Sequence, residues 1–130
     1  MPRLLLAVAL LASFAFPALA RDAAAPAPSY PAVALLSTGT TILGEKIHYP
    51  KGNAHITAAI VTLAPGARTI LHKHPVPLFA YILEGELTVD YGPQGTRSFK
   101  QGQTYMEAMD VAHFGENKSD KPVRLIAVYM

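Results

Sequence analysis

Residues 66–85 read GARTILHKHPVPLFAYILEG, and this stretch decides the fold that we expect of the chain. His72 and His74 stand one residue apart in a run of apolar and β-branched residues, which favours a strand over Thr69–His74. Side chains two residues apart on a strand point to the same face, so both imidazoles should converge on one point. Neutral imidazoles bind divalent transition metals well, but such a pair alone is more often exposed or hydrogen-bonded, so its surroundings must decide.

The surroundings of the pair have a regular spacing. Five residues separate Gly66 from His72, three separate His74 from Leu78, and six separate Leu78 from Gly85. A second stretch, residues 102–117, reads GQTYMEAMDVAHFGEN. Ten residues separate Gly102 from His113, and three separate His113 from Asn117.

Together the two stretches resemble the two motifs of the cupin superfamily, in spacing at every motif position and in residue type at most of them. The resemblance covers roughly Ile56 to Met130. It implies an all-β fold, a small double-stranded β-helix or jelly-roll-like barrel. It also implies that His72, His74 and His113 occupy the family's three histidine ligand positions and hold one divalent metal ion, with Fe, Mn, Zn, Ni, Co and Cu not distinguished.

The chain departs from the family motifs at three positions. Leu78 stands where the first motif usually has a glutamate ligand, and Ala108 and Asp110 stand where the second has proline and glycine. The loss of the carboxylate leaves a three-histidine site, which resembles that of some cupin dioxygenases. It also removes a charge that helps to hold the metal, so a structural barrel with an empty site stays open as an alternative.

Glu107 is a candidate to replace the missing carboxylate. Alternation along the expected strand Gln103–Ala108 puts Gln103, Tyr105 and Glu107 on one face, which should point inward. A buried carboxylate is costly unless it is paired, hydrogen-bonded or metal-bound, so Glu107 would serve as a general base or an additional ligand. The alternative is a rotated strand with Glu107 in solvent.

Short β-branched and aromatic runs recur at intervals of roughly ten residues between Gly, Pro, Asn and Asp, as in all-β domains. The expected strands are Ala54–Leu63, Thr69–His74, Phe79–Leu83, Glu86–Tyr91, Thr96–Lys100, Gln103–Ala108 and Val123–Tyr129.

Two further histidines, His48 and His55, fit no motif spacing, and we expect both to be exposed or structural.

The N-terminal part of the chain has the order of a secretory signal. Arg3 precedes an uncharged apolar run over residues 4–16, followed by Pro-Ala-Leu-Ala. A membrane anchor is the alternative, but the run is shorter than the roughly 20 residues that span a bilayer. We therefore expect a signal peptide over 1–20, an Ala/Pro-rich linker over 21–32, a barrel domain over 33–130, and a secreted or periplasmic protein without a membrane segment after cleavage.

Composition excludes several classes of function. The chain has 130 residues, which predicts one folded domain, and it has no cysteine, which excludes thiol chemistry. Its 11 basic and 9 acidic residues give no basic surface for nucleic acid. The sequence predicts an exported metal-binding cupin that acts on or binds a small molecule. The finer candidate is a three-histidine dioxygenase, with other metal-dependent isomerases or hydrolases open. The rival is a non-catalytic barrel that binds a small molecule or metal, and a homodimer is a further expectation because cupins commonly dimerise.

Overall fold

A computed structural model describes residues 32–130, of which residues 33–130 form one compact unit. The expected signal peptide and the expected linker, apart from Ala32, lie outside the described residues. Within residues 32–130, no helix is long and apolar enough to cross a membrane.

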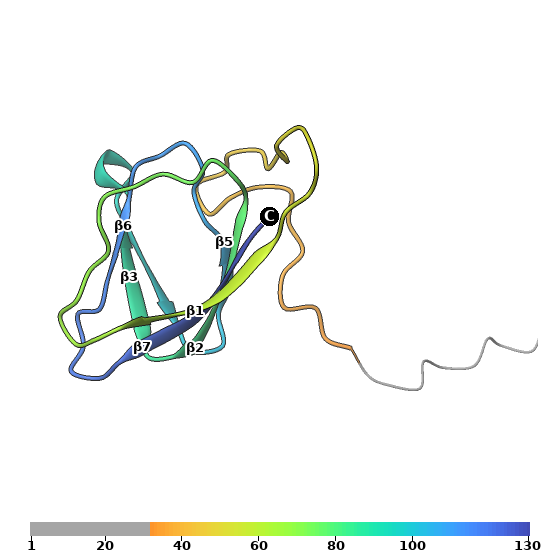
Figure 1. Ribbon diagram of the computed structural model, residues 1–130. Helices are drawn as coiled ribbons and strands as arrows, with labels where there is room; N and C mark the ends of the chain where they lie inside the picture. The colour runs from red at the N-terminus through yellow and green to blue at the C-terminus, as the bar shows by residue number, and fades with distance from the viewer. Residues whose placement is uncertain (1–31) are drawn as a thin grey trace, which may run out of the picture. The chain divides into compact units, whose positions relative to one another are not determined.

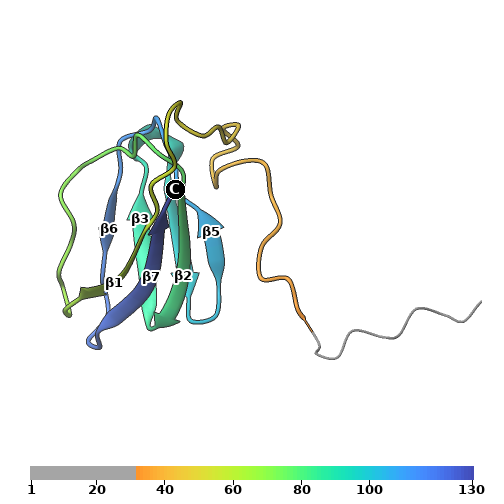
Figure 2. The same ribbon diagram turned by 45° about the vertical axis from the view of Figure 1, so that its right-hand side comes forward.

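The unit consists of two antiparallel sheets that lie opposite one another (Figures 1 and 2). The first sheet has the strand order β1-β7-β2-β5, and the second has the order β4-β3-β6. This is the all-β, jelly-roll-like architecture that the sequence predicts. The elements are β1 (Thr57–Leu63), β2 (Leu78–Glu84), β3 (Glu86–Asp90), the 3₁₀ helix η1 (Gly92–Gln94), β4 (Thr96–Lys100), β5 (Thr104–Met106), β6 (Phe114–Glu116) and β7 (Val123–Tyr129).

The core lies between the two sheets because the central strands alternate in burial. In β2, β3 and β7 every second side chain is buried, as expected when one face of each strand packs inward. The buried residues on these strands are aliphatic, so the interior of the barrel is apolar. They are Leu78, Ala80 and Ile82 of β2, Leu87 and Val89 of β3, and Val123, Leu125 and Ala127 of β7.

Gly85 joins β2 to β3 in a conformation that only glycine adopts without strain. Its φ is 79°, and a Cβ built there would lie 2.8 Å from the carbonyl oxygen of Pro122. A side chain would therefore both strain the hairpin and push it away from the start of β7. This explains why glycine occupies the last position of the first motif.

The segment Thr69–His74 is not a strand, so this expectation is wrong. Isolated bridges join Arg68 to Glu116 and His72 to His113. Between these bridges, the segment 68–72 therefore has one more residue than the segment 113–116 opposite it. The extra residue interrupts the ladder in the manner of a β-bulge, and Ile70 is 82% exposed there. The hydroxyl of Thr69 accepts the hydrogen bond of the Gly115 N–H in place of a backbone carbonyl.

Two further details differ from the expected strands. The short strand β6, which holds the other side of this bulge, was not predicted. Gln103 lies in the turn before β5 and is exposed, and its Oε1 accepts a hydrogen bond from the Lys100 N–H. Gln103 therefore does not share the inward face of Tyr105 and Glu107, both of which are buried.

The residues before β1 cover the edge of the first sheet. The hydroxyl of Thr104 in β5 donates to the carbonyl of Leu35, and the N–H of Ile42 donates to the carbonyl of Met106. A bridge between Thr40 and Lys46 folds this segment into a tight turn. The turn brings Glu45 to the loop that follows β5 and precedes His113.

Candidate metal centre

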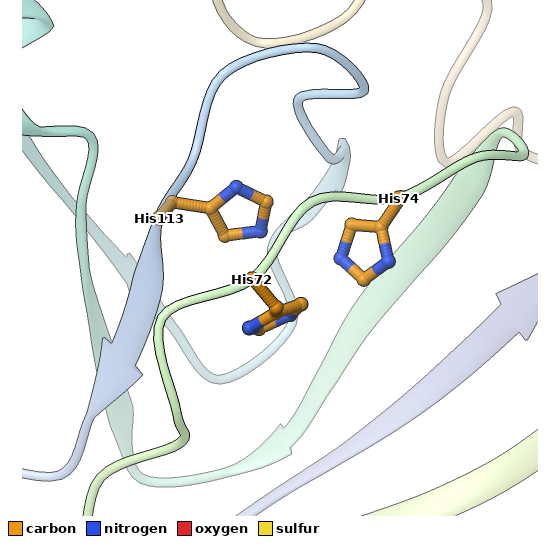
Figure 3. A group of neighbouring side chains, drawn as sticks. All are labelled: His72, His74 and His113. Atoms are coloured by element: carbon orange, nitrogen blue, oxygen red, sulfur yellow. The ribbon is translucent and has the colours of Figure 1, made fainter.

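The three histidines of the two motifs lie together in space. Their candidate ligand atoms all lie within 4.8 Å of one another, and Figure 3 shows the three rings gathered around one space. His72 and His74 come from the segment that leads into β2, whereas His113 directly precedes β6. Two backbone hydrogen bonds, from His72 N–H to the His113 carbonyl and the reverse, join the two segments. His72 and His74 thus lie beside His113, although the segment that carries the first two forms no regular strand.

Hydrogen bonds orient two of the rings with the same nitrogen toward this space. Nδ1 of His72 lies 2.7 Å from the carbonyl oxygen of Ile70, and Nδ1 of His113 lies 2.8 Å from that of Val111. A carbonyl can only accept, so each Nδ1 carries the hydrogen and each neutral ring keeps a lone pair on Nε2. Backbone carbonyls commonly orient metal-binding histidines in this way.

The chemistry of these nitrogens fits a divalent metal ion. Nε2 of His113 is buried and has no hydrogen-bond partner, which is costly for a polar atom unless an ion satisfies it. Burial, followed by the charges of His113 and His72, lowers the pKa of His74 to about 4, so this ring is neutral at neutral pH. Neutral imidazoles are the form that binds a metal. The cluster therefore fits one divalent ion, without selecting which one.

Glu107 lies inside the barrel beside the histidines and is only 5% exposed. Its Oε1 accepts hydrogen bonds from the hydroxyl of Tyr91 at 2.7 Å and from the N–H of Ala108 at 2.8 Å. Its Oε2 lies 3.6 Å from Nε2 of His113, which is too long for a hydrogen bond. The structure thus places Glu107 on the inward face and contradicts the alternative of a solvated side chain.

Two buried tyrosines surround this carboxylate. Burial and then the charge of Glu107 raise the pKa of Tyr91 and of Tyr105 far above that of an exposed tyrosine. Tyr91 therefore stays protonated and acts as a permanent donor to Oε1. The hydroxyl of Tyr91 and the N–H of Ala108 both bond to Oε1, so Oε2 is the oxygen that faces His113.

A cavity of about 80 Å³ lies beside the three histidines and Glu107. It is lined by the three histidines and Glu107, and Leu78 contributes an aliphatic wall at the position where the family motif has glutamate. His48 and His55 are exposed and take no part in the cluster. Tyr105 lines the cavity, whereas Gln103 does not.

Glu45 is a residue near the site that sequence reasoning missed. Its Oε2 accepts hydrogen bonds from the Thr41 hydroxyl at 2.8 Å and the Met109 N–H at 3.0 Å. Its Oε1 accepts the N–H of Asp110 at 2.9 Å. Burial alone would raise the pKa of Glu45, but these three donors and His113 lower it. Glu45 therefore fixes the loop between Glu107 and His113, and no local motif could have identified a contact so distant in sequence.

Comparison with known proteins agrees with this fold. The family model described as "Cupin domain" matches residues 59–129, and no curated protein matches the chain. A Cupin 2 conserved barrel domain protein from Salinispora arenicola CNS-205 is 20% identical, with a TM-score of 0.53 over 64% of this chain and 69% of that one. This likeness supports the fold alone.

Two oxalate decarboxylases are also similar in structure. That of Lactobacillus farciminis, in a formate complex, is 28% identical, with a TM-score of 0.51 over 57% of this chain. That of Bacillus subtilis, studied for its Mn(II) centres, is 28% identical over 57% of this chain, with a TM-score of 0.48. The chain covers 23% and 21% of their lengths, so it matches only a part of either protein. The family model, however, spans more than half of this chain, and the protein therefore belongs to the family of cupin domains.

Proposed function

We propose that the protein is an exported, metal-dependent cupin enzyme that acts on a small molecule, with Glu107 as its general base. His72, His74 and His113 are the proposed metal ligands. The observation that carries the proposal is the position of Glu107, whose side chain is buried and whose Oε2 faces Nε2 of His113 at 3.6 Å, while its Oε1 accepts two hydrogen bonds. The export part rests on the order of residues 1–20.

A divalent ion held by three neutral imidazoles would act as a Lewis acid that lowers the pKa of an oxygen donor in the cavity. Glu107 is placed to receive the proton at Oε2, because Oε1 already accepts two hydrogen bonds. Tyr91 keeps the carboxylate in one orientation, so the base does not swing away as it changes charge. The aliphatic walls limit water, which strengthens these electrostatic interactions.

The finer form of the proposal is a three-histidine dioxygenase. It is supported by Leu78, which lines the cavity without offering a carboxylate ligand, and by the resemblance of such a site to some cupin dioxygenases. Substrate-dependent oxygen uptake after iron is restored would support this form.

A probe that is neutral at pH 7 tests Glu107 without knowledge of the substrate. Acetohydroxamic acid is small, offers two oxygen donors and binds metals as an anion, so its proton must move when it binds. We expect calorimetry of the zinc-loaded protein in buffers of different ionisation enthalpy to show no net proton release, because Glu107 keeps the proton. Glu107→Gln should release one proton for each hydroxamate bound.

Equal proton release by both proteins would contradict a base at Glu107. It would favour the second candidate, a non-catalytic barrel that captures a small ligand or a metal ion.

A further inference from the structure

The charge composition of the cavity restricts what it can bind. Besides the histidines, Glu107 is the one carboxylate among the described residues that line it, and none of them is Lys or Arg. The other lining residues are neutral and most are aliphatic. Those that face the ligand space from the two sheets include Val61, Leu63, Leu78, Leu87, Val89 and Leu125.

A ligand with two negative groups would find a cationic partner for only one of them. One oxygen anion can lie at the histidines, where the proposed metal charge exceeds the charge of Glu107 by one. A second anion would lie against side chains such as Leu87 and Leu125, and it would also be repelled by Glu107. Burial of an unpaired carboxylate is among the most costly events in a protein interior.

The size of the cavity also restricts the ligand. A volume of about 80 Å³ accommodates a ligand of only a handful of non-hydrogen atoms, since a cavity that holds one water molecule needs about 10–15 Å³ by the same measure. The aliphatic walls gain free energy when an apolar group replaces water there. The ligand therefore needs one polar end and a short apolar end.

We infer that this site takes a small oxygen acid that carries no more than one negative charge and a short apolar tail, and that it rejects dicarboxylates. This inference rests on the proposed metal centre, because the histidine end must hold the anion. It concerns the ligand class and applies equally to an enzyme and to a binding protein.

Cobalt(II) makes the inference measurable, because the visible spectrum of the cobalt-loaded protein changes when an oxygen ligand binds. We would titrate it with propanoate and malonate, which have the same number of carbon atoms and differ in one carboxylate. In free solution malonate binds cobalt better than propanoate does, because it chelates. We expect the protein to reverse this order and to bind propanoate at least about tenfold more tightly.

A longer acid tests the size of the cavity. Octanoate should bind weakly to the unmodified protein, and Leu87→Ala should improve its binding severalfold by enlarging the cavity. Val123→Ala is the matched control, because Val123 is fully buried but does not line the cavity. An equal gain in both variants, or none in either, would argue against the assigned ligand space.

Different results would contradict the proposed metal centre and the inferred ligand class. If cobalt does not bind, or binds His113→Ala as well as the unmodified protein, the proposed metal centre is wrong, and the ligand class falls with it. If cobalt binds through the histidines but malonate binds as tightly as propanoate, the ligand class alone is overturned.

Discussion

Nε2 of His113 lies 3.6 Å from Oε2 of Glu107, and both side chains are buried in the barrel. Because Nδ1 of His113 is engaged with the carbonyl of Val111, the neutral form of the ring has its lone pair on Nε2, the atom nearer the carboxylate. Two acceptors that face each other in a nearly dry site repel one another unless a cation or a proton lies between them. This relationship connects the proposed metal centre with the proposed base.

Glu107→Gln separates the two roles that a carboxylate could have. The substitution keeps the size of the side chain and an oxygen that can accept from Tyr91 and Ala108. If Glu107 is the base, we expect zinc affinity, measured by competition with a chelator, to change less than about threefold. A loss beyond tenfold, partly rescued by Leu78→Glu, would instead identify Glu107 as a ligand.

Glu45→Gln should weaken metal binding although Glu45 is not near enough to be a ligand in the cluster. The carboxylate accepts two hydrogen bonds from the loop leading to His113, from the N–H groups of Met109 and Asp110, and one amide oxygen replaces its two oxygens poorly. Loss of such an orienting contact typically costs between about tenfold and 100-fold in metal affinity. We expect a loss near the lower end of this range, measured with the same chelator competition.

Thr104→Val is the control for Glu45. It removes another contact of the same N-terminal segment, the hydrogen bond to the Leu35 carbonyl, which lies away from the loop. Both variants should lower the melting temperature, but Thr104→Val should keep full zinc affinity. Equal zinc affinity in the two variants would mean that Glu45 only stabilises the fold.

Local patterns predicted the regular strands well. The bounds expected for β4 and β7 are those of the structure, and in β7 the burial alternates because one face packs on the core. The expected strand that the structure lacks failed for a physical reason that no local pattern reveals. Thr69–His74 has strand-forming residues, but the extra residue opposite β6 interrupts its ladder. Pro75 and Pro77, which lack an N–H, follow it directly.

Part of the site was also predictable from local patterns. Motif spacing located His72, His74 and His113, and strand alternation located Glu107, because each depends on residues close in sequence or on a known pattern. Glu45 reaches the same loop through tertiary contacts with Met109 and Asp110, and sequence separation hides such a contact. The same holds for Tyr91, which meets Glu107 across the barrel.

The metal-free protein should lose stability in a defined range of acid pH. His74 has a folded-state pKa of about 4, below its ordinary value of about 6.5, so between these values the unfolded chain binds more protons. The free energy of unfolding should therefore be constant above about pH 6.5 and fall as the pH decreases towards 4. Urea unfolding at several pH values measures this, and zinc should oppose the loss.

His74→Gln supplies the control for this pH dependence. Glutamine does not titrate, so the slope between pH 6.5 and 4 should become smaller, whereas His55→Gln at an exposed position should leave it unchanged. Identical slopes in all three proteins would show that His74 is not the group responsible.

Export predicts a defined mature terminus. Given Arg3, the apolar run over residues 4–16 and the small residues before position 21, the exported protein should begin at or near Arg21. Mass spectrometry of the periplasmic or secreted protein measures this directly. A product that keeps Met1 and stays with the membrane would replace the signal peptide with an anchor.

The most direct test of the metal centre is the metal content of untagged protein, determined by elemental mass spectrometry after loading and desalting. We expect one divalent ion per chain in the unmodified protein and in the control His55→Ala, whose histidine is exposed and outside the cluster. His72→Ala, His74→Ala and His113→Ala should each retain well under half of that amount. Full occupancy in all three single variants would contradict the three-histidine centre.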